Sequence, residues 1–456
     1  MTRLVAALVV VLSLASSAGA QAPSVAGDWL GTLQAGAINL RLVLHIAAAG
    51  DGRLTATLDS IDQGAKGIPV SAIALKDTTL DLAVDAVKGS YSGRLSADGE
   101  SIDGTWTQGG SLPLVFRRVK DAAALVPKRP QNPAPPFPYR QEDVTYANAS
   151  ANVTLSGTLT IPAGAGPFPA VLLISGSGPQ DRNESLMGHQ PFLVLADHLT
   201  RQGIAVLRVD DRGVGKSTGN FAAATTADFA SDAEAGVTYL LARPEVNRQK
   251  LGLIGHSEGG IIAPIVGARN PNVAFMVLLA GSGVPGDEIL VAQSAMIASA
   301  AGIPREQVDQ NVRNLRELLD IIEREPDDAA RQARMREVMA GKLPAAQMDA
   351  QIKMLLSPWF RYFISYDPAV VLRTITRPVL ALNGEKDMQV PAKPNLDAIR
   401  AALAAAGNTR SEVAEMPGLN HLFQTAPTGA PTEYAAIEET MAPAVLDRIA
   451  RWIAAQ

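Results

Sequence analysis

A serine in the middle of the chain lies in a glycine-framed motif that can perform nucleophilic chemistry. Residues 255–260 read Gly-His-Ser-Glu-Gly-Gly and directly follow the apolar run 250–254. A G-x-S-x-G turn between a strand and a helix holds its serine in a sharp, strained bend with the hydroxyl group exposed above a sheet. Glycine is expected at 255 and 259 because a Cβ atom there would collide with the crossing backbone. Ser257 is therefore the candidate nucleophile.

A serine hydroxyl reacts only when a base removes its proton and a carboxylate orients that base. In this type of turn the partners follow in the order serine, acid, histidine. The histidines of the chain are His45, His189, His198, His256 and His421. His421 alone lies downstream of Ser257 and outside its turn, on an expected loop after a late strand at 412–415. His256 adjoins the serine, but we expect it to point away and to have a structural role.

The carboxylate is expected between the serine and the histidine. Residues 378–383 read as a buried strand, and the loop after it runs Gly-Glu-Lys-Asp from 384 to 387. Asp387 is the predicted partner of His421, with Glu385 as the alternative.

An oxyanion hole requires two backbone N–H groups, one from the residue after the nucleophile and one from an earlier loop between a strand and a helix. Glu258 supplies the first amide. The second is expected from the loop 175–179, Ser-Gly-Ser-Gly-Pro, which follows the apolar strand 169–174. The register favours the amide of Ser177, and Gly178 is the alternative.

Four stretches of the sequence carry a family resemblance. They are residues 175–182 (SGSGPQDR), 206–217 (VLRVDDRGVGKS), 255–260 (GHSEGG) and 418–424 (GLNHLFQ). From about Tyr139 to Gln456 the chain resembles the α/β-hydrolases of the EstD-like carboxylesterase group, also described as serine aminopeptidase-like hydrolases. The resemblance implies hydrolysis of carboxylic esters and a triad of Ser257, Asp387 and His421.

The elements around these residues predict an α/β-hydrolase fold, a mostly parallel sheet with helices on both faces, over residues 141–456. Strand-like segments alternate with helical ones, which is typical of such a sheet. An insertion at about 285–370 has helical periodicity and is expected to form a cap over the carboxyl ends of the strands, where α/β sheets bind ligands. Its aromatic segment 358–366 could line a substrate pocket or attach the cap to the core.

The part before the hydrolase segment shows three different patterns. Residues 1–20 resemble a cleavable signal peptide, with a basic residue, an apolar run too short to span a bilayer and an Ala-Gly-Ala site. We therefore expect a periplasmic or extracellular protein without a membrane span. Residues 24–120 alternate with period two and contain Gly-rich turns, which predicts a small antiparallel meander or barrel. Residues 121–140 form a proline-rich linker.

Composition excludes several other classes. The formal net charge of −5 gives no electrostatic basis for a nucleic-acid partner. Cysteine is absent, and no HExxH motif or carboxylate cluster indicates a metal, so we expect no metal and no cofactor. The segment 210–217 resembles a phosphate-binding loop, but the motif requires glycine where Asp210 stands.

The sequence therefore favours a serine carboxylesterase that acts on a small-molecule ester, with short acyl chains preferred. Two other hypotheses remain open. One is a serine peptidase or amidase that uses the same triad. The other is a binding protein in which the N-terminal β-domain acts and the hydrolase part is inactive. No pattern indicates an oligomeric state or the role of the β-domain.

Overall fold

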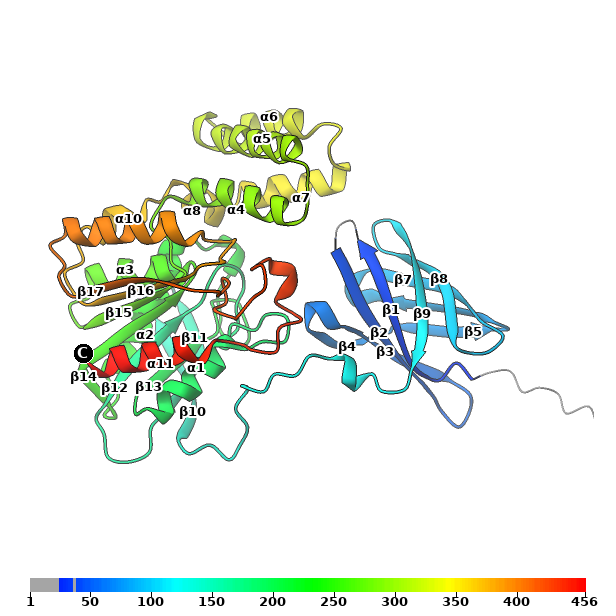
Figure 1. Ribbon diagram of the computed structural model, residues 1–456, viewed down its shortest axis with the longest axis horizontal. Coiled ribbons are helices and arrows are strands. Elements are labelled where there is room, and N and C mark those ends of the chain that lie inside the picture. The colour runs from blue at the N-terminus through cyan, green and yellow to red at the C-terminus, as the bar shows by residue number, and fades with distance from the viewer. Residues whose placement is uncertain (1–23, 36–37) are drawn as a thin grey trace, which may run out of the picture. The chain divides into compact units, whose positions relative to one another are not determined.

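The computed structural model describes residues 24–35 and 38–456, and the chain divides into two compact units (Figure 1). Within the described residues, the first unit comprises 24–35, 38–60 and 66–123, and the second comprises 61–65 and 124–456. The segment 1–20, for which a signal peptide is predicted, lies outside the described residues.

The first unit is an antiparallel sheet around its own apolar core. Its strands are β1 (Gly27–Ala35), β2 (Ile38–Ala48), β3 (Leu54–Ser60), β4 (Ala65–Pro69), β5 (Ala72–Lys76), β6 (Thr79–Val84), β7 (Gly89–Leu95), β8 (Ser101–Thr107) and β9 (Ser111–Val119). They follow the order β4-β3-β2-β1-β9-β8-β7-β6-β5. Trp29, Tyr91 and Trp106 are almost fully buried, because alternate residues of each strand point to one face of the sheet. The two tryptophans therefore belong to the core.

The second unit is built on an eight-stranded sheet. Its strands are β10 (Arg140–Asn148), β11 (Val153–Ile161), β12 (Phe168–Ile174), β13 (Ala205–Val209), β14 (Val246–His256), β15 (Phe275–Leu279), β16 (Val379–Gly384) and β17 (Ser411–Met416). They follow the order β10-β11-β13-β12-β14-β15-β16-β17. The six strands from β13 to β17 in this order are parallel, and β11 pairs antiparallel with both β10 and β13.

Helices cover both faces of this sheet (Figure 1). Helices α1 (Pro191–Arg201) and α11 (Pro443–Ala454) share one apolar core with the sheet. Helices α2 (Thr226–Leu241), α3 (Gly259–Arg269) and α10 (Ala392–Ala405) share the other. Strand β12 contributes Val171 and Leu173 to the first core and Ala170 and Leu172 to the second. A strand buried on both faces is continuously apolar, and the predicted fold class is confirmed.

A helical cap separates β15 from β16. It comprises α4 (Gly286–Ala300), α5 (Arg305–Arg324), α6 (Asp328–Met339), α7 (Ala345–Leu355), α8 (Pro358–Ser365) and α9 (Pro368–Leu372). In Figure 1 these helices stack on the side of the second unit where α10 and α3 also lie. Among the described residues, no helix combines the length and apolar character needed to cross a bilayer.

Candidate active site

The predicted nucleophile lies at the bend between β14 and α3. Ser257 has a φ of +53°, a left-handed conformation that costs a non-glycine residue about 1 to 3 kcal/mol and persists only where its surroundings impose it. Its amide donates to the carbonyl oxygen of Leu279 over 2.8 Å. A Cβ atom at Gly255 would collide with the carbonyl of Gly259, and one at Gly259 would collide with that of Ile174. The two glycines therefore allow this bend to form.

The structure brings His421 and Asp387 together. Asp387 follows β16 and His421 follows β17, and Nδ1 of the histidine lies 2.7 Å from Oδ2 of the aspartate. Both residues are almost completely buried. The other oxygen of Asp387 accepts the amides of Gln389 and Val390, each over 2.8 Å. Since a carboxylate accepts all three hydrogen bonds, Nδ1 of His421 holds the proton and Nε2 is left as the acceptor.

The alternative acid has a different partner. Glu385 Oε2 accepts the amide of Gly418 over 2.7 Å. Glu385 thus fastens the loop after β17, whereas Asp387 contacts the imidazole of His421.

The loop after β12 presents its backbone to the same region. The amide of Gly176 is engaged, because it donates to Glu184 Oε1 over 2.8 Å. The amides of Ser177 and Glu258 have no acceptor among the described residues. Ser177 lines the cavity that contains Ser257, and Gly178 lines a neighbouring cavity instead. Ser177, Glu258 and the candidate nucleophile thus line the same cavity.

A cavity of about 330 Å³ contains Ser257, His421 and Ser177 in its wall. Its apolar side is supplied mainly by the cap, with Ile289 and Leu290 from α4 and Trp359 and Phe363 from α8. The rings of Trp359 and Phe363 are stacked, with centroids 5.3 Å apart and planes 12° apart. Part of the aromatic segment 358–366 therefore lines the cavity, while Phe360 and Ile364 are buried in the core.

His256 does not point away from the catalytic side, contrary to the expectation from the sequence. Its ring centroid lies 4.9 Å from that of His421. Nδ1 lies 2.8 Å from Glu184 Oε1, and Nε2 lies 3.1 Å from the carbonyl oxygen of His421. Both partners are acceptors, so both ring nitrogens must carry protons. Burial lowers the pKa of His256, but the Glu184 carboxylate outweighs burial and raises it.

Glu184 is a residue that the sequence analysis missed. It is 5% exposed, has a φ of +53° and joins the loop after β12, at Gly176, to the turn at His256. No motif marks it, because its partners become neighbours only when β12, β14 and the loop of His421 are assembled.

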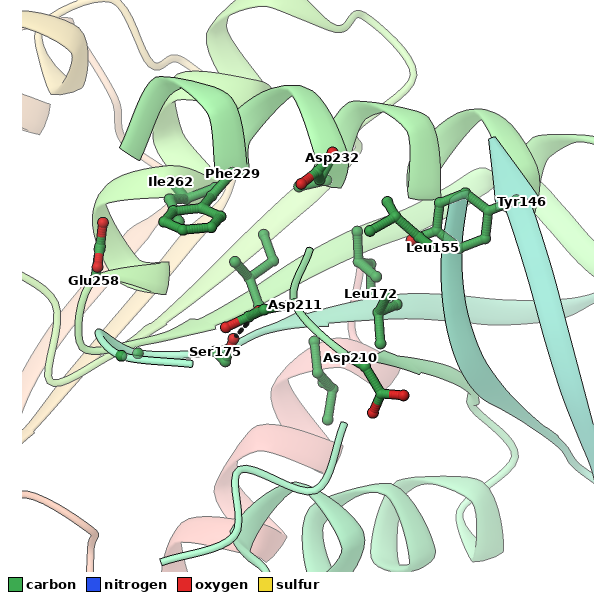
Figure 2. Close-up of a pocket in the computed structure, with 16 residues that line it drawn as sticks. Tyr146, Leu155, Leu172, Ser175, Asp210, Asp211, Phe229, Asp232, Glu258 and Ile262 are labelled. Atoms are coloured by element: carbon green, nitrogen blue, oxygen red, sulfur yellow. Dashed lines mark hydrogen bonds between the residues drawn. The ribbon is translucent and has the colours of Figure 1, made fainter. Parts of the chain in front are cut away.

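A second, smaller cavity of about 50 Å³ is lined by Ser175, Gly176 and Gly178 of the loop after β12. Figure 2 shows Ser175 and Asp211 joined by a hydrogen bond in its wall, with Glu258 and Ile262 nearby. Asp211 also accepts the amide of Gln180 over 3.0 Å. Desolvation raises the pKa of Asp211 to about 7. This carboxyl group therefore holds both ends of the loop that contains Ser177.

The described ranges 24–35 and 38–456 contain no group of three or more histidine, aspartate or glutamate side chains that could bind a metal ion.

A strained serine between a parallel strand and a helix, with a buried acid–histidine pair after two later strands, defines the α/β-hydrolase class. Residues 190–426 match the family described as serine aminopeptidase, S33. The chain belongs to this family and is a serine hydrolase.

The chain is also similar to individual proteins. The chain is 27% identical over 322 residues to Esterase EstD of Thermotoga maritima, which covers 70% of this chain and 68% of that protein. Among solved structures, an esterase of Pyrococcus furiosus, Pf2001, matches 70% of this chain and 91% of its own, with 17% identity and a TM-score of 0.44. The α/β-hydrolase GrgF from a Penicillium species matches 69% and 98%, with 17% identity and a TM-score of 0.43.

Proposed function

We propose that this protein is a serine carboxylesterase that hydrolyses short-chain esters through Ser257, Asp387 and His421. The observation that carries the proposal is the contact of 2.7 Å between His421 Nδ1 and Asp387 Oδ2, in a cavity that also contains Ser257 in its strained turn. The name of the relative Esterase EstD supports ester hydrolysis as the reaction.

The proposed mechanism is acyl transfer to water. Nε2 of His421 takes the proton of Ser257 as the hydroxyl attacks the ester carbonyl, and the carboxylate of Asp387 stabilises the resulting imidazolium. The amides of Glu258 and Ser177 donate to the oxyanion, a type of contact that is worth about 3 to 4 kcal/mol for each donor. His421 then protonates the leaving alcohol, and water, activated in the same way, releases the acid and restores the serine.

The size of the cavity supports short acyl groups. Ligand pockets generally range from about 300 to 1,000 Å³, so a cavity of about 330 Å³ is at the small end. Ile289, Leu290 and Phe363 give it an apolar wall suited to an alkyl or small aromatic acyl group. A small apolar ester is therefore the proposed substrate.

A second candidate is a serine peptidase or amidase. The description of the matching family as serine aminopeptidase favours it, and the same triad can cleave amides. The fold does not decide between ester and amide hydrolysis. Substrates with alcohol and with amine leaving groups must therefore be compared directly.

The decisive experiment treats the purified protein with a fluorophosphonate probe and then measures hydrolysis of p-nitrophenyl esters of graded acyl length beside aminoacyl anilides. We expect label on Ser257 and fastest turnover of the short esters. Ser257→Ala should abolish labelling and lower kcat by a factor on the order of 10⁶, as in triads that act as a unit.

Three outcomes would contradict the proposal. A loss below tenfold in Ser257→Ala removes this serine from the nucleophile role. Turnover of anilides but not of esters supports the peptidase instead. Absence of both labelling and turnover supports a binding protein in which the β-domain acts.

We also propose that the chain is exported to the periplasm or the medium, on the basis of the signal-like segment 1–20. Amino-terminal sequencing of the protein recovered from a secreting host should give a start near Gln21. A start at residue 1 or 2 in that protein would contradict export.

A further inference from the structure

The side chain of Glu258 has an environment that its position in the elbow does not explain. Glu258 is the N-cap residue of α3, yet its carboxyl group makes no capping hydrogen bond with that helix. It is 3% exposed and is turned into the protein. A buried carboxyl group that does not support its own helix must be held by other elements, because an unsatisfied one would be costly.

Three separate elements interact with this carboxyl group. Thr226, the first residue of α2, donates through Oγ1 to Oε1 over 2.7 Å. Trp359 of the cap donates its indole N–H to both oxygens, each over 2.9 Å. The side chain of Ser177, in the loop after β12, also favours the charged form of this carboxyl group and lowers its pKa. The carboxyl group of Glu258 thus joins the cap, the oxyanion loop and the sheet-side helix α2 directly beside Ser257.

The donors are all uncharged. Burial therefore raises the pKa of the Glu258 carboxyl, and the hydrogen bonds from Thr226, Trp359 and Ser177 oppose that rise only in part. Glutamine has the shape of glutamate and still offers one acceptor oxygen.

The indole that Glu258 holds is part of the substrate cavity. Trp359 and its stacked neighbour Phe363 both line the cavity that contains Ser257. The Trp359 ring also stacks on Phe363, meets Phe360 edge-on and packs against the apolar core of the unit. The hydrogen bond to Glu258 is the polar contact that directs the indole N–H of this aromatic wall toward the residue beside the nucleophile.

We infer that the side chain of Glu258 is a positioning residue that sets the acyl specificity of the site. By holding Trp359 it limits the depth of the cavity, and by holding Ser177 it keeps the oxyanion loop in register with the nucleophile. This role is distinct from that of the Glu258 backbone amide, and it rests on the proposed esterase function.

The test compares four variants with the wild type, namely Glu258→Ala, Glu258→Gln, Trp359→Phe and the double variant Glu258→Ala/Trp359→Phe. Each is assayed with p-nitrophenyl butyrate and octanoate. We expect Glu258→Ala and Trp359→Phe each to raise the octanoate-to-butyrate ratio of kcat/KM about tenfold. The double variant should also raise it about tenfold, because both changes remove the same bond.

The kinetic constants separate positioning from binding. Glu258→Ala should lower kcat for butyrate about tenfold while KM changes less than threefold, since the oxyanion loop loses its anchor at Ser177. Glu258→Gln should restore at least a third of the wild-type kcat. Trp452→Phe is the matched control: Trp452 of α11 packs in the core against Phe275 of β15, so this change should leave the acyl ratio unchanged.

Several results would overturn the inference. The first is a hundredfold change of the acyl ratio in the double variant. The second is an unchanged acyl ratio in both single variants. The third is a kcat for butyrate as low in Glu258→Gln as in Glu258→Ala. If Glu258→Ala does not fold, Trp359→Phe and Glu258→Gln still decide the matter.

Fluorophosphonate labelling and ester hydrolysis of the wild type separate this inference from the proposed function. If the wild type neither labels nor hydrolyses esters, the proposed function is wrong. If the wild type does both and the variants keep its acyl ratio, only the role of Glu258 is wrong.

Discussion

Two acids that stand two residues apart after β16 have different surroundings and therefore different expected roles. Asp387 is completely buried, and its second oxygen accepts two backbone amides. These contacts hold the carboxylate in one orientation while it faces His421. The side chain of Glu385 instead accepts a backbone amide of the neighbouring loop. This difference can be measured by changing each acid to its amide.

Asp387→Asn should lower kcat by a factor on the order of 10⁴, because an amide N–H facing Nδ1 favours the tautomer in which Nε2 carries the proton and cannot accept one from Ser257. Glu385→Gln is the matched control and should change kcat less than threefold, since glutamine can still accept the amide of Gly418. Steady-state hydrolysis of one ester by both variants checks this. A larger loss in Glu385→Gln would reverse the assignment of the acid.

At the level of elements, the loop 175–182 after β12 is held by an ion pair at its far end. Arg182 contacts Asp210 in two places, Nε to Oδ1 over 3.0 Å and Nη2 to Oδ2 over 2.7 Å, and its amide also donates to Oδ1. The carboxyl group of Asp210 is 7% exposed. Burial opposes its charge, but the bonds from Arg182 outweigh burial and lower the pKa of Asp210. The loop thus depends on a planar, two-point contact.

Arg182→Leu should lower the free energy of unfolding by about 3 kcal/mol, because removing one partner leaves the other charge buried. Arg182→Lys should lower the free energy of unfolding by a smaller amount, since an ammonium group keeps the charge but cannot make the two-point contact. Arg140→Leu is the control, because Arg140 is 56% exposed in its pairs with Glu142 and Glu245 and should cost less than about 1 kcal/mol. Urea unfolding of the three variants measures these losses. Equal losses of unfolding free energy in Arg182→Leu and Arg140→Leu would contradict the prediction.

At the scale of the whole hydrolase unit, His189 joins segments that lie far apart in the sequence. It is fully buried, and its ring nitrogens contact the hydroxyl of Thr440 and the carbonyl oxygen of Tyr434, each over 2.9 Å. Desolvation lowers the pKa of His189 to about 4, with hydrogen bonding to the backbone of Tyr434 opposing the change. The folded protein therefore holds this imidazole neutral.

This pKa predicts an acid-sensitive contribution to stability. Between about pH 6.5 and pH 4 the unfolded chain binds a proton at His189 that the folded chain does not, so stability falls as the pH decreases through this window. His189→Gln should remove on the order of 2 kcal/mol of the difference in unfolding free energy between pH 7 and pH 4.5. His198→Gln, at a partly exposed histidine, is the control. The same pH dependence in wild type and His189→Gln would contradict the prediction.

Much of the fold could be predicted because its signals are local. The strand β12 is apolar at successive positions, the glycines at 255 and 259 follow from the geometry of a tight turn, and the cap has helical periodicity. The candidate triad could be named in the same way, because each member directly follows a recognisable strand and parallel strands present their carboxyl ends at one edge. These assignments require no knowledge of distant contacts.

The class of fold, the strained bend at Ser257 and its few candidate partners could therefore be read from the order of residues along the chain. The contacts of Glu184 with His256 and of Glu258 with Trp359 of the cap become visible only in the folded chain. The spacing of 101 residues between Glu258 and Trp359 leaves no periodic pattern along the chain. Their contact exists only because the sheet and the cap, each stabilised by its own apolar packing, bring the two side chains together, and burial then requires the carboxyl group to find donors there.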